Sequence, residues 1–138
     1  MIKLVTFTNQ NEKLLEFNFK DIRIDMAPRE PYWITIAAAK QTLTICGNAF
    51  IAYDESAQGV TANTQDFNFA KSWIQTYYKD NQKILLISSP SDEPLFIFYG
   101  TTISISNIKN NYAEFSVNGK KIFINNLHWV ILTKNATE

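Results

Sequence analysis

The chain has 138 residues, of which 13 are Lys or Arg and 13 are Asp or Glu, and its formal net charge is zero. This length fits a single domain, 1–138, that buries a genuine core. The charge balance excludes the long-range positive field that favours nucleic acid or an anionic membrane surface. A single cysteine excludes an intrachain disulfide and a zinc site built from paired cysteines.

The N-terminal run Ile2 to Phe7 alternates in polarity, unlike the charged region and uninterrupted apolar core of a signal peptide. No apolar run approaches the ~20 residues that a helical membrane span needs. We therefore expect a cytoplasmic protein, or a virion-associated one if the chain belongs to an assembly.

Two strand-like runs, Ile2 to Thr8 and Leu14 to Lys20, flank a polar loop and predict an antiparallel hairpin. The apolar residues occupy odd positions up to Phe19 and even positions from Ile22 onward. Because a period-two pattern changes phase only at an extra residue, we expect a β-bulge or a corner at residues 20–21. The chain would bend there into another sheet.

The next connection, Met26 to Tyr32, contains two prolines, which cannot donate hydrogen bonds to a sheet, and a strand over Trp33 to Ala39 follows. Two further strands, Thr42 to Cys46 and Ala49 to Tyr53, flank the Gly47–Asn48 dipeptide. Glycine accepts positive φ, so this pattern predicts a hairpin with a type II′ turn. Both faces of the hairpin are at least half apolar, which favours a central position.

The stretch from about residue 66 to 81 is the one segment typical of a helix. Apolar side chains recur every three or four positions from Phe69 onward, and polar side chains fill the other face. Thr64 or Asp66 can cap its N-terminus, and Asn81 is the expected C-terminal residue. Since so short a helix is unstable alone, we interpret its aromatic stripe as core packing against a sheet and not as a ligand site.

Two continuous apolar runs, Ile84 to Ser88 and Leu95 to Tyr99, follow the helix. Such runs are typical of strands that are covered on both faces, so we expect both to lie under the helix. In the run from Thr101 to Ile108, isoleucine alternates with serine, which indicates a strand with one solvent-facing side.

The clearest turn signal is Asn118–Gly119, a type I′ dipeptide between strands over Tyr112 to Val117 and Lys120 to Asn125. A two-residue loop at this position places Phe115 opposite Ile122. The apolar pairing supports that register.

With a last strand over His128 to Thr133, the chain is predicted to be mainly β (α+β), with about ten antiparallel strands and a single amphipathic helix. A β-sandwich and a partly open β-barrel both satisfy this pattern, because hairpins specify neighbouring strands but not closure.

The sequence holds no recognisable catalytic, metal-ligand or cofactor motif. His128 is the only histidine, and a pair with Cys46 is conceivable because a thiolate nucleophile needs an adjacent base. We interpret the carboxylate pairs Asp54–Glu55 and Asp92–Glu93 as solvated loop residues. We therefore expect no cofactor and no metal, and we keep an enzyme only as a third alternative.

Aromatic side chains on a sheet face can stack on bases or sugars or anchor a protein partner. Lysines outnumber carboxylates slightly in the C-terminal quarter, which supports nucleic-acid binding only weakly. The candidate binding residues are Tyr32, Trp33, Tyr99, Tyr112, Trp129, Lys120 and Lys121.

The leading hypothesis is a non-catalytic protein-interaction or assembly domain, such as a phage or mobile-element accessory or structural protein. It rests on neutral charge, the lack of catalytic motifs and the many strand edges, which invite pairing with a protein partner or a second copy. The alternative is a β-barrel that binds a small ligand or single-stranded nucleic acid.

Overall fold

The computed structural model describes residues 1–8, 13–26, 33–38, 40–46, 49–57, 59–61, 67–91, 93–109 and 112–134. These residues form one helix and three antiparallel sheets, so the predicted mainly β fold with a single helix is confirmed. Within the described residues, no pairing between the end strands of a sheet closes that sheet into a barrel.

The helix is α1 (Phe67–Tyr77), and the strands are β1 (Ile2–Phe7), β2 (Lys13–Phe19), β3 (Arg23–Met26), β4 (Trp33–Ala38), β5 (Gln41–Cys46), β6 (Phe50–Asp54), β7 (Gly59–Thr61), β8 (Lys83–Ser88), β9 (Pro94–Gly100), β10 (Ile103–Lys109), β11 (Tyr112–Val117), β12 (Lys120–Asn125) and β13 (His128–Thr133). A six-stranded sheet has the order β10-β11-β12-β6-β1-β2, a four-stranded sheet β13-β8-β9-β7 and a three-stranded sheet β3-β4-β5.

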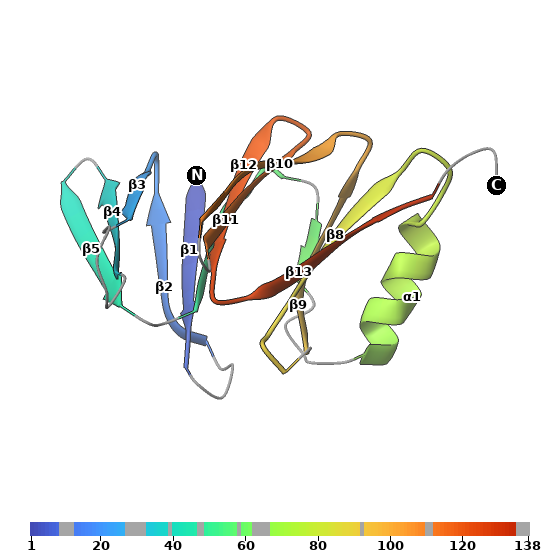
Figure 1. Ribbon diagram of the computed structural model, residues 1–138, viewed down its shortest axis with the longest axis horizontal. Coiled ribbons are helices and arrows are strands. Elements are labelled where there is room, and N and C mark those ends of the chain that lie inside the picture. Colours follow the sequence, from blue (N-terminus) through green and yellow to red (C-terminus); the bar gives the residue numbers. More distant parts are fainter. Residues whose placement is uncertain are drawn as a thin grey trace.

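The sheets and the helix lie in layers (Figure 1). From left to right in this view come the three-stranded sheet, the six-stranded sheet, the four-stranded sheet and α1. A separate hydrophobic cluster fills each of the three interfaces between layers. The six-stranded sheet is therefore a middle layer, with Phe50 buried on one face and Phe115 on the other.

The N-terminal hairpin and the corner after it are confirmed. β1 pairs with β2 in an antiparallel register that sets Leu4 opposite Phe17. β2 belongs to the six-stranded sheet, whereas β3 begins the three-stranded sheet. The phase change between Phe19 and Ile22 thus marks the point at which the chain leaves one layer and enters the next.

The predicted hairpin of β5 and β6 is wrong. β5 pairs with β4, whereas β6 pairs with β1 and β12, so the two strands belong to different sheets. Ile45 of β5 and Phe50 of β6 both pack in the core between these sheets. The apolar faces that suggested lateral pairing therefore meet face to face, and the Gly47–Asn48 turn itself lies outside the described residues. The expected central position holds for β6.

The helix lies where it was predicted but ends earlier, at Tyr77 instead of near Asn81. Asn81 takes a φ of 64° in the following turn, and its N–H donates to the carbonyl oxygen of Lys134 at 3.0 Å. This bond ties the turn between α1 and β8 to the residue that follows β13. The proposed N-caps, Thr64 and Asp66, lie outside the described residues.

The aromatic stripe of α1 packs on the four-stranded sheet, as predicted. Trp73 stacks on Tyr77 at 4.6 Å between ring centroids, and Tyr77 stacks on Tyr99 of β9 at 4.3 Å. Ile84 and Ile97 lie buried beneath the helix. The two continuous apolar strands are covered on both faces, because Leu85 and Phe98 pack on the other side.

The Asn118–Gly119 turn has the predicted type I′ conformation, with φ values of 50° and 83°. The predicted register is confirmed, since Phe115 lies opposite Ile122. The N–H of Asn118 also donates to the carbonyl oxygen of Thr102 at 2.7 Å, which ties this turn to the start of β10.

Gly100→Ala is expected to lower the free energy of unfolding by about 1–3 kcal/mol, as overpacking does in a close contact. A methyl group at Gly100 would lie 2.7 Å from Cγ of Asn118, so the Asn118 side chain would have to move and give up the hydrogen bond that it accepts from the N–H of Thr102. Urea denaturation measures the loss. Glycine accepts the positive φ of Asn118, so the Asn118→Gly background should remove the clash; an equal loss in that background would contradict this contact.

Candidate functional site

β10 is an exposed end strand of the six-stranded sheet. Ile103 is buried, whereas the residues from Ser104 to Lys109 are all exposed. β11 pairs with one side of β10, and no described strand pairs with the other. An unpaired row of backbone N–H and C=O groups is a template for another strand.

A β-bulge at Ser106 decides which way the side chains of β10 point. The register against β11 shifts by one residue between Ile105 and Asn107, which leaves Ser106 as the extra residue. Because side chains alternate along a strand, this extra residue keeps Ile108 on the face of Ile105. The same shift turns Lys109 to the opposite face, together with Asn107.

The isoleucine face of β10 lies toward the four-stranded sheet. Ile105 and Ile108 are 44% and 53% exposed. Ile105 pairs with Phe115, whose ring meets Trp129 of β13 edge-on at 5.0 Å between centroids. The end strands β10 and β13 therefore lie on the same side of the molecule. On the β10 side of this contact, Ile105 and Ile108 are only partly covered.

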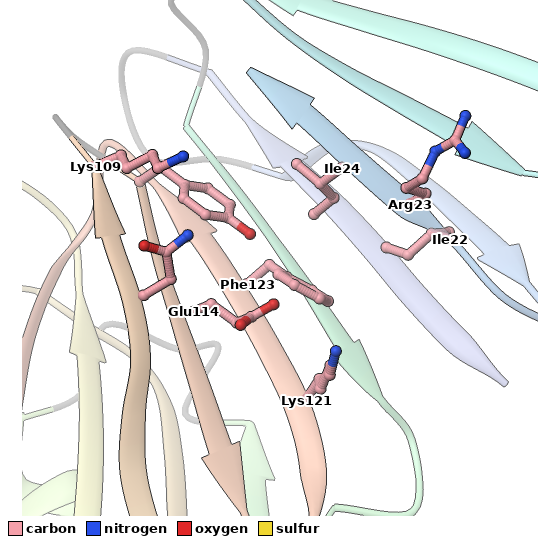
Figure 2. Close-up of a pocket in the computed structure, with 9 residues that line it drawn as sticks. Ile22, Arg23, Ile24, Lys109, Glu114, Lys121 and Phe123 are labelled. Carbon is pink, nitrogen blue, oxygen red and sulfur yellow. The ribbon is translucent and has the colours of Figure 1, made fainter.

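The opposite face of β10 lines a pocket of about 450 Å³ (Figure 2). The pocket lies where the uncovered part of the six-stranded sheet meets β3, the end strand of the three-stranded sheet. Its volume falls in the range typical of small-molecule sites. The lining residues are Ile22, Arg23, Ile24, Asn107, Lys109, Tyr112, Glu114, Lys121 and Phe123. We call this the β3–β11 pocket.

The β3–β11 pocket carries a local positive charge in a neutral chain. Lys109 and Lys121 line it together with one carboxylate, Glu114, whereas the guanidinium of Arg23 points away from the pocket (Figure 2). Among the residues that the structure describes, neither Lys109 nor Lys121 forms an ion pair with a carboxylate. The two ammonium groups are therefore available to an anion from solution.

Tyr112 contributes a neutral hydroxyl to the β3–β11 pocket. Its side chain is only 6% exposed, and its ring stacks on Phe123 at 6.3 Å between centroids. Burial, and next the negative charge of Glu114, raise the pKa of the Tyr112 hydroxyl well above its usual value of 10.0. The group keeps its proton at neutral pH, and it has no hydrogen bond to another described residue.

A second pocket of about 560 Å³ adjoins the first and shares Ile22 and Arg23 with it. It lies over the corner between β2 and β3, where Lys20, Lys40 and the carboxylate of Asp21 line it. We call it the corner pocket.

Only two of the predicted binding residues, Tyr112 and Lys121, meet in the β3–β11 pocket. Tyr112 is buried, in contrast to the expected exposed aromatic. Lys120 is exposed at the start of β12 but does not line this pocket.

The other predicted aromatics lie elsewhere. Tyr99 is half-buried under α1, and Trp129 is half-buried in the core between two sheets. Trp33 begins β4, although the position of its side chain is not described, and Tyr32 lies outside the described residues. These aromatics therefore do not form one binding face.

The conceivable Cys46 and His128 pair is not brought together. Cys46 ends β5 in the three-stranded sheet, whereas His128 begins β13 in the four-stranded sheet, and the six-stranded sheet lies between them. Asp54 accepts hydrogen bonds from the N–H and the Oγ of Ser56 at 2.9 and 2.6 Å, and these bonds lower the pKa of its carboxyl. That carboxylate holds a local turn, and Asp92 lies outside the described residues.

No three His, Cys, Asp or Glu side chains of the described ranges lie close enough to hold a metal ion together. No helix within those ranges has the length and apolar character needed to span a membrane. No family model, curated protein or solved structure matches this chain.

Sequence reasoning missed Arg23, Asn107 and Lys109 as pocket residues. One signal for two of them is visible in the sequence: Ile108 falls out of phase with Ile103 and Ile105. An extra residue between them explains that change and places Asn107 and Lys109 on the polar face. Arg23 carries no such signal, because only the stacking of two sheets brings it to this pocket.

Proposed function

We propose that this protein is a non-catalytic assembly domain that pairs with a second copy of itself through the edge of β10. The observation that carries the proposal is that β10 is exposed from Ser104 to Lys109 and that no described strand pairs with its outer side. Pairing of an end strand with a strand of another chain satisfies backbone groups that otherwise bond only to water.

The side chains of β10 add an apolar contribution to this backbone pairing. Ile105 and Ile108 are about half exposed and lie on one face. Covering the exposed part of each contributes roughly 1 kcal/mol, since full burial of an isoleucine is worth about 1.5–3 kcal/mol. Of the large hydrophobic side chains that are exposed among the described residues, these two are the pair that lies on a single strand.

A second copy is favoured as the partner because charge does not oppose it. The segment from Ile103 to Ile108 contains no charged residue, and the whole chain has a net charge of zero. In an antiparallel pair centred on Ser106, the two copies of Lys109 lie about 20 Å apart, from a rise of about 3.3 Å per residue. At that separation their repulsion is largely screened at physiological salt.

Sedimentation velocity over a range of concentrations tests this proposal. The wild-type protein is expected to form a discrete dimer or a higher symmetric oligomer. The double variant Ile105→Lys/Ile108→Lys should weaken association at least about ten-fold, because two ammonium groups replace the apolar contact.

A matched control is Leu15→Lys on β2, the strand at the other end of the same sheet. Leu15 is 50% exposed, so the substitution adds a charge at a comparable site and should leave association unchanged. A wild-type protein that stays monomeric at its highest soluble concentration would overturn the proposal. Dissociation by Leu15→Lys alone would place the interface at β2 instead of at β10.

A further inference from the structure

We propose that Lys83 restrains self-association by occupying the first outward carbonyl group of β10. This inference rests on the proposed pairing of β10 with a second copy and adds a control to that same edge. The contact that carries it joins Nζ of Lys83 to the carbonyl oxygen of Ile103 at 3.5 Å. We call this contact the Lys83 gate.

The hairpin after β10 decides which backbone groups of β10 face its open side. In a two-residue hairpin the residues that flank the turn form a hydrogen-bonded pair, so the N–H and C=O of Val117 point toward Lys120. Ile103 lies opposite Val117 on the other side of β11, so its own N–H and C=O point away from β11. The hydrogen bond from the N–H of Asn118 to the carbonyl oxygen of Thr102 agrees with this phase.

The same alternation identifies the rest of the outward row. Ile105 lies opposite Phe115 of β11, and Ile108 lies opposite Ala113. Because hydrogen-bonded pairs recur at every second residue, both of these β11 residues bond to β12. The backbone groups of Ile105 and Ile108 therefore also face the open side of β10. Together with Ile103, they offer three outward positions to a second strand.

Ile103 differs from the other two positions because it is covered. It is 3% exposed, whereas Ile105 and Ile108 are 44% and 53% exposed. Lys83 begins β8 and lies on the same face as Leu85, which packs between the four-stranded and six-stranded sheets. From there its side chain crosses to β10, where the ammonium group meets the outward carbonyl oxygen of Ile103.

A lysine at this place opposes the addition of a strand. An incoming N–H would have to displace a positive charge from the carbonyl oxygen, and covering the ammonium group would cost desolvation free energy. Lysines are a common protection of sheet edges against unwanted strand pairing. The Lys83 gate therefore weakens pairing at the Ile103 end and leaves Ile105 and Ile108 as the open positions.

The two open positions suit a symmetric pair. In an antiparallel pair with its two-fold axis at the bulge, Ile105 of each copy lies opposite Ile108 of the other, on the same face. Such cross-strand apolar pairs stabilise a sheet. Each copy of Ile103 then lies at an outer end of the ladder, where its Lys83 gate limits the length of the pairing.

Sedimentation velocity of Lys83→Ala tests the inference. Loss of the ammonium group frees the Ile103 carbonyl of each copy for one more hydrogen bond, so association should tighten about ten-fold. Lys83→Arg keeps a cation of similar reach and should associate like the wild type. Thermal unfolding should confirm that both variants fold, since Lys83 is half-buried.

The matched control is Lys71→Ala, which removes the same charge from the exposed face of α1. This variant should associate like the wild type, because the expected gain depends on a local contact and not on net charge. The triple variant Lys83→Ala/Ile105→Lys/Ile108→Lys should lose the gain, since the tighter association passes through β10.

Failure of the Lys83 gate and failure of self-association give different results. A wild-type protein that associates as tightly as Lys83→Ala would overturn the gate and leave the pairing of β10 intact. An equal gain in Lys71→Ala, or a gain that persists in the triple variant, would also overturn the gate. A monomeric wild type overturns self-association; a monomeric Lys83→Ala would then overturn the gate with it, whereas dimerisation of Lys83→Ala alone would support the gate.

Discussion

Phe115→Ala and Phe50→Ala are each expected to lower the free energy of unfolding by about 3–5 kcal/mol, the usual cost of removing a buried phenyl ring. Both side chains are fully buried, but they belong to different hydrophobic clusters. Domains of this size are stable by about 5–15 kcal/mol, so each loss takes a large share of the total.

The pair of variants tests the layered architecture, because Phe50 and Phe115 lie on opposite faces of the six-stranded sheet. A sheet with one solvated face would suffer from one substitution and tolerate the other. Guanidinium denaturation measures both losses, with Leu15→Ala as the control at a half-exposed site where the cost should stay below about 0.5 kcal/mol. A loss below about 1 kcal/mol for either phenylalanine would show that its face is not packed.

Alkaline pH is expected to destabilise the wild-type protein more steeply than Tyr112→Phe. The folded-state pKa of Tyr112 is raised above the usual 10.0 by burial and by Glu114. Above about pH 10 the unfolded chain releases this proton while the folded protein retains it, so stability falls as pH rises. The extra slope is at most about 1.4 kcal/mol per pH unit.

Urea denaturation at several pH values measures this slope for both proteins. Below pH 10 the hydroxyl is neutral in both states, so the difference in stability between wild type and Tyr112→Phe should not vary with pH. The difference should shift steadily in favour of the variant at higher pH. Equal alkaline slopes would show that the Tyr112 hydroxyl is solvated in the folded protein.

Local signals predicted most of the secondary structure. The Asn118–Gly119 dipeptide specified both a turn and a register, because a type I′ turn needs positive φ at two successive residues and Asn and Gly accept it. The phase change after Phe19 located the corner between sheets. The stripe on α1 indicated a covered helix face, which the packing of Trp73 and Tyr77 on β9 bears out.

The stacking of sheets was not visible in the sequence. Gly47–Asn48 is a good hairpin dipeptide, yet Ile45 and Phe50 meet across two layers instead of side by side. A strand that is apolar on both faces can satisfy its packing in either way, so alternation alone does not decide between them.

The candidate site was harder to predict than the fold for a related reason. Lys121 and Tyr112 come from one hairpin, and their register follows from the turn. Arg23 reaches the same pocket only because the three-stranded sheet covers part of the six-stranded sheet and leaves the rest open. A pocket between layers depends on where one layer ends, and no local pattern encodes that boundary.

Hydrogen–deuterium exchange at two protein concentrations tests self-pairing of β10 most directly. At the higher concentration the amides of residues 103–109 should exchange more slowly, since a second strand would then protect them, while those of residues 13–19 on β2 should exchange at the same rate at both concentrations. Exchange of β10 that does not depend on concentration, or protection that arises on β2 instead, would contradict assembly through this edge.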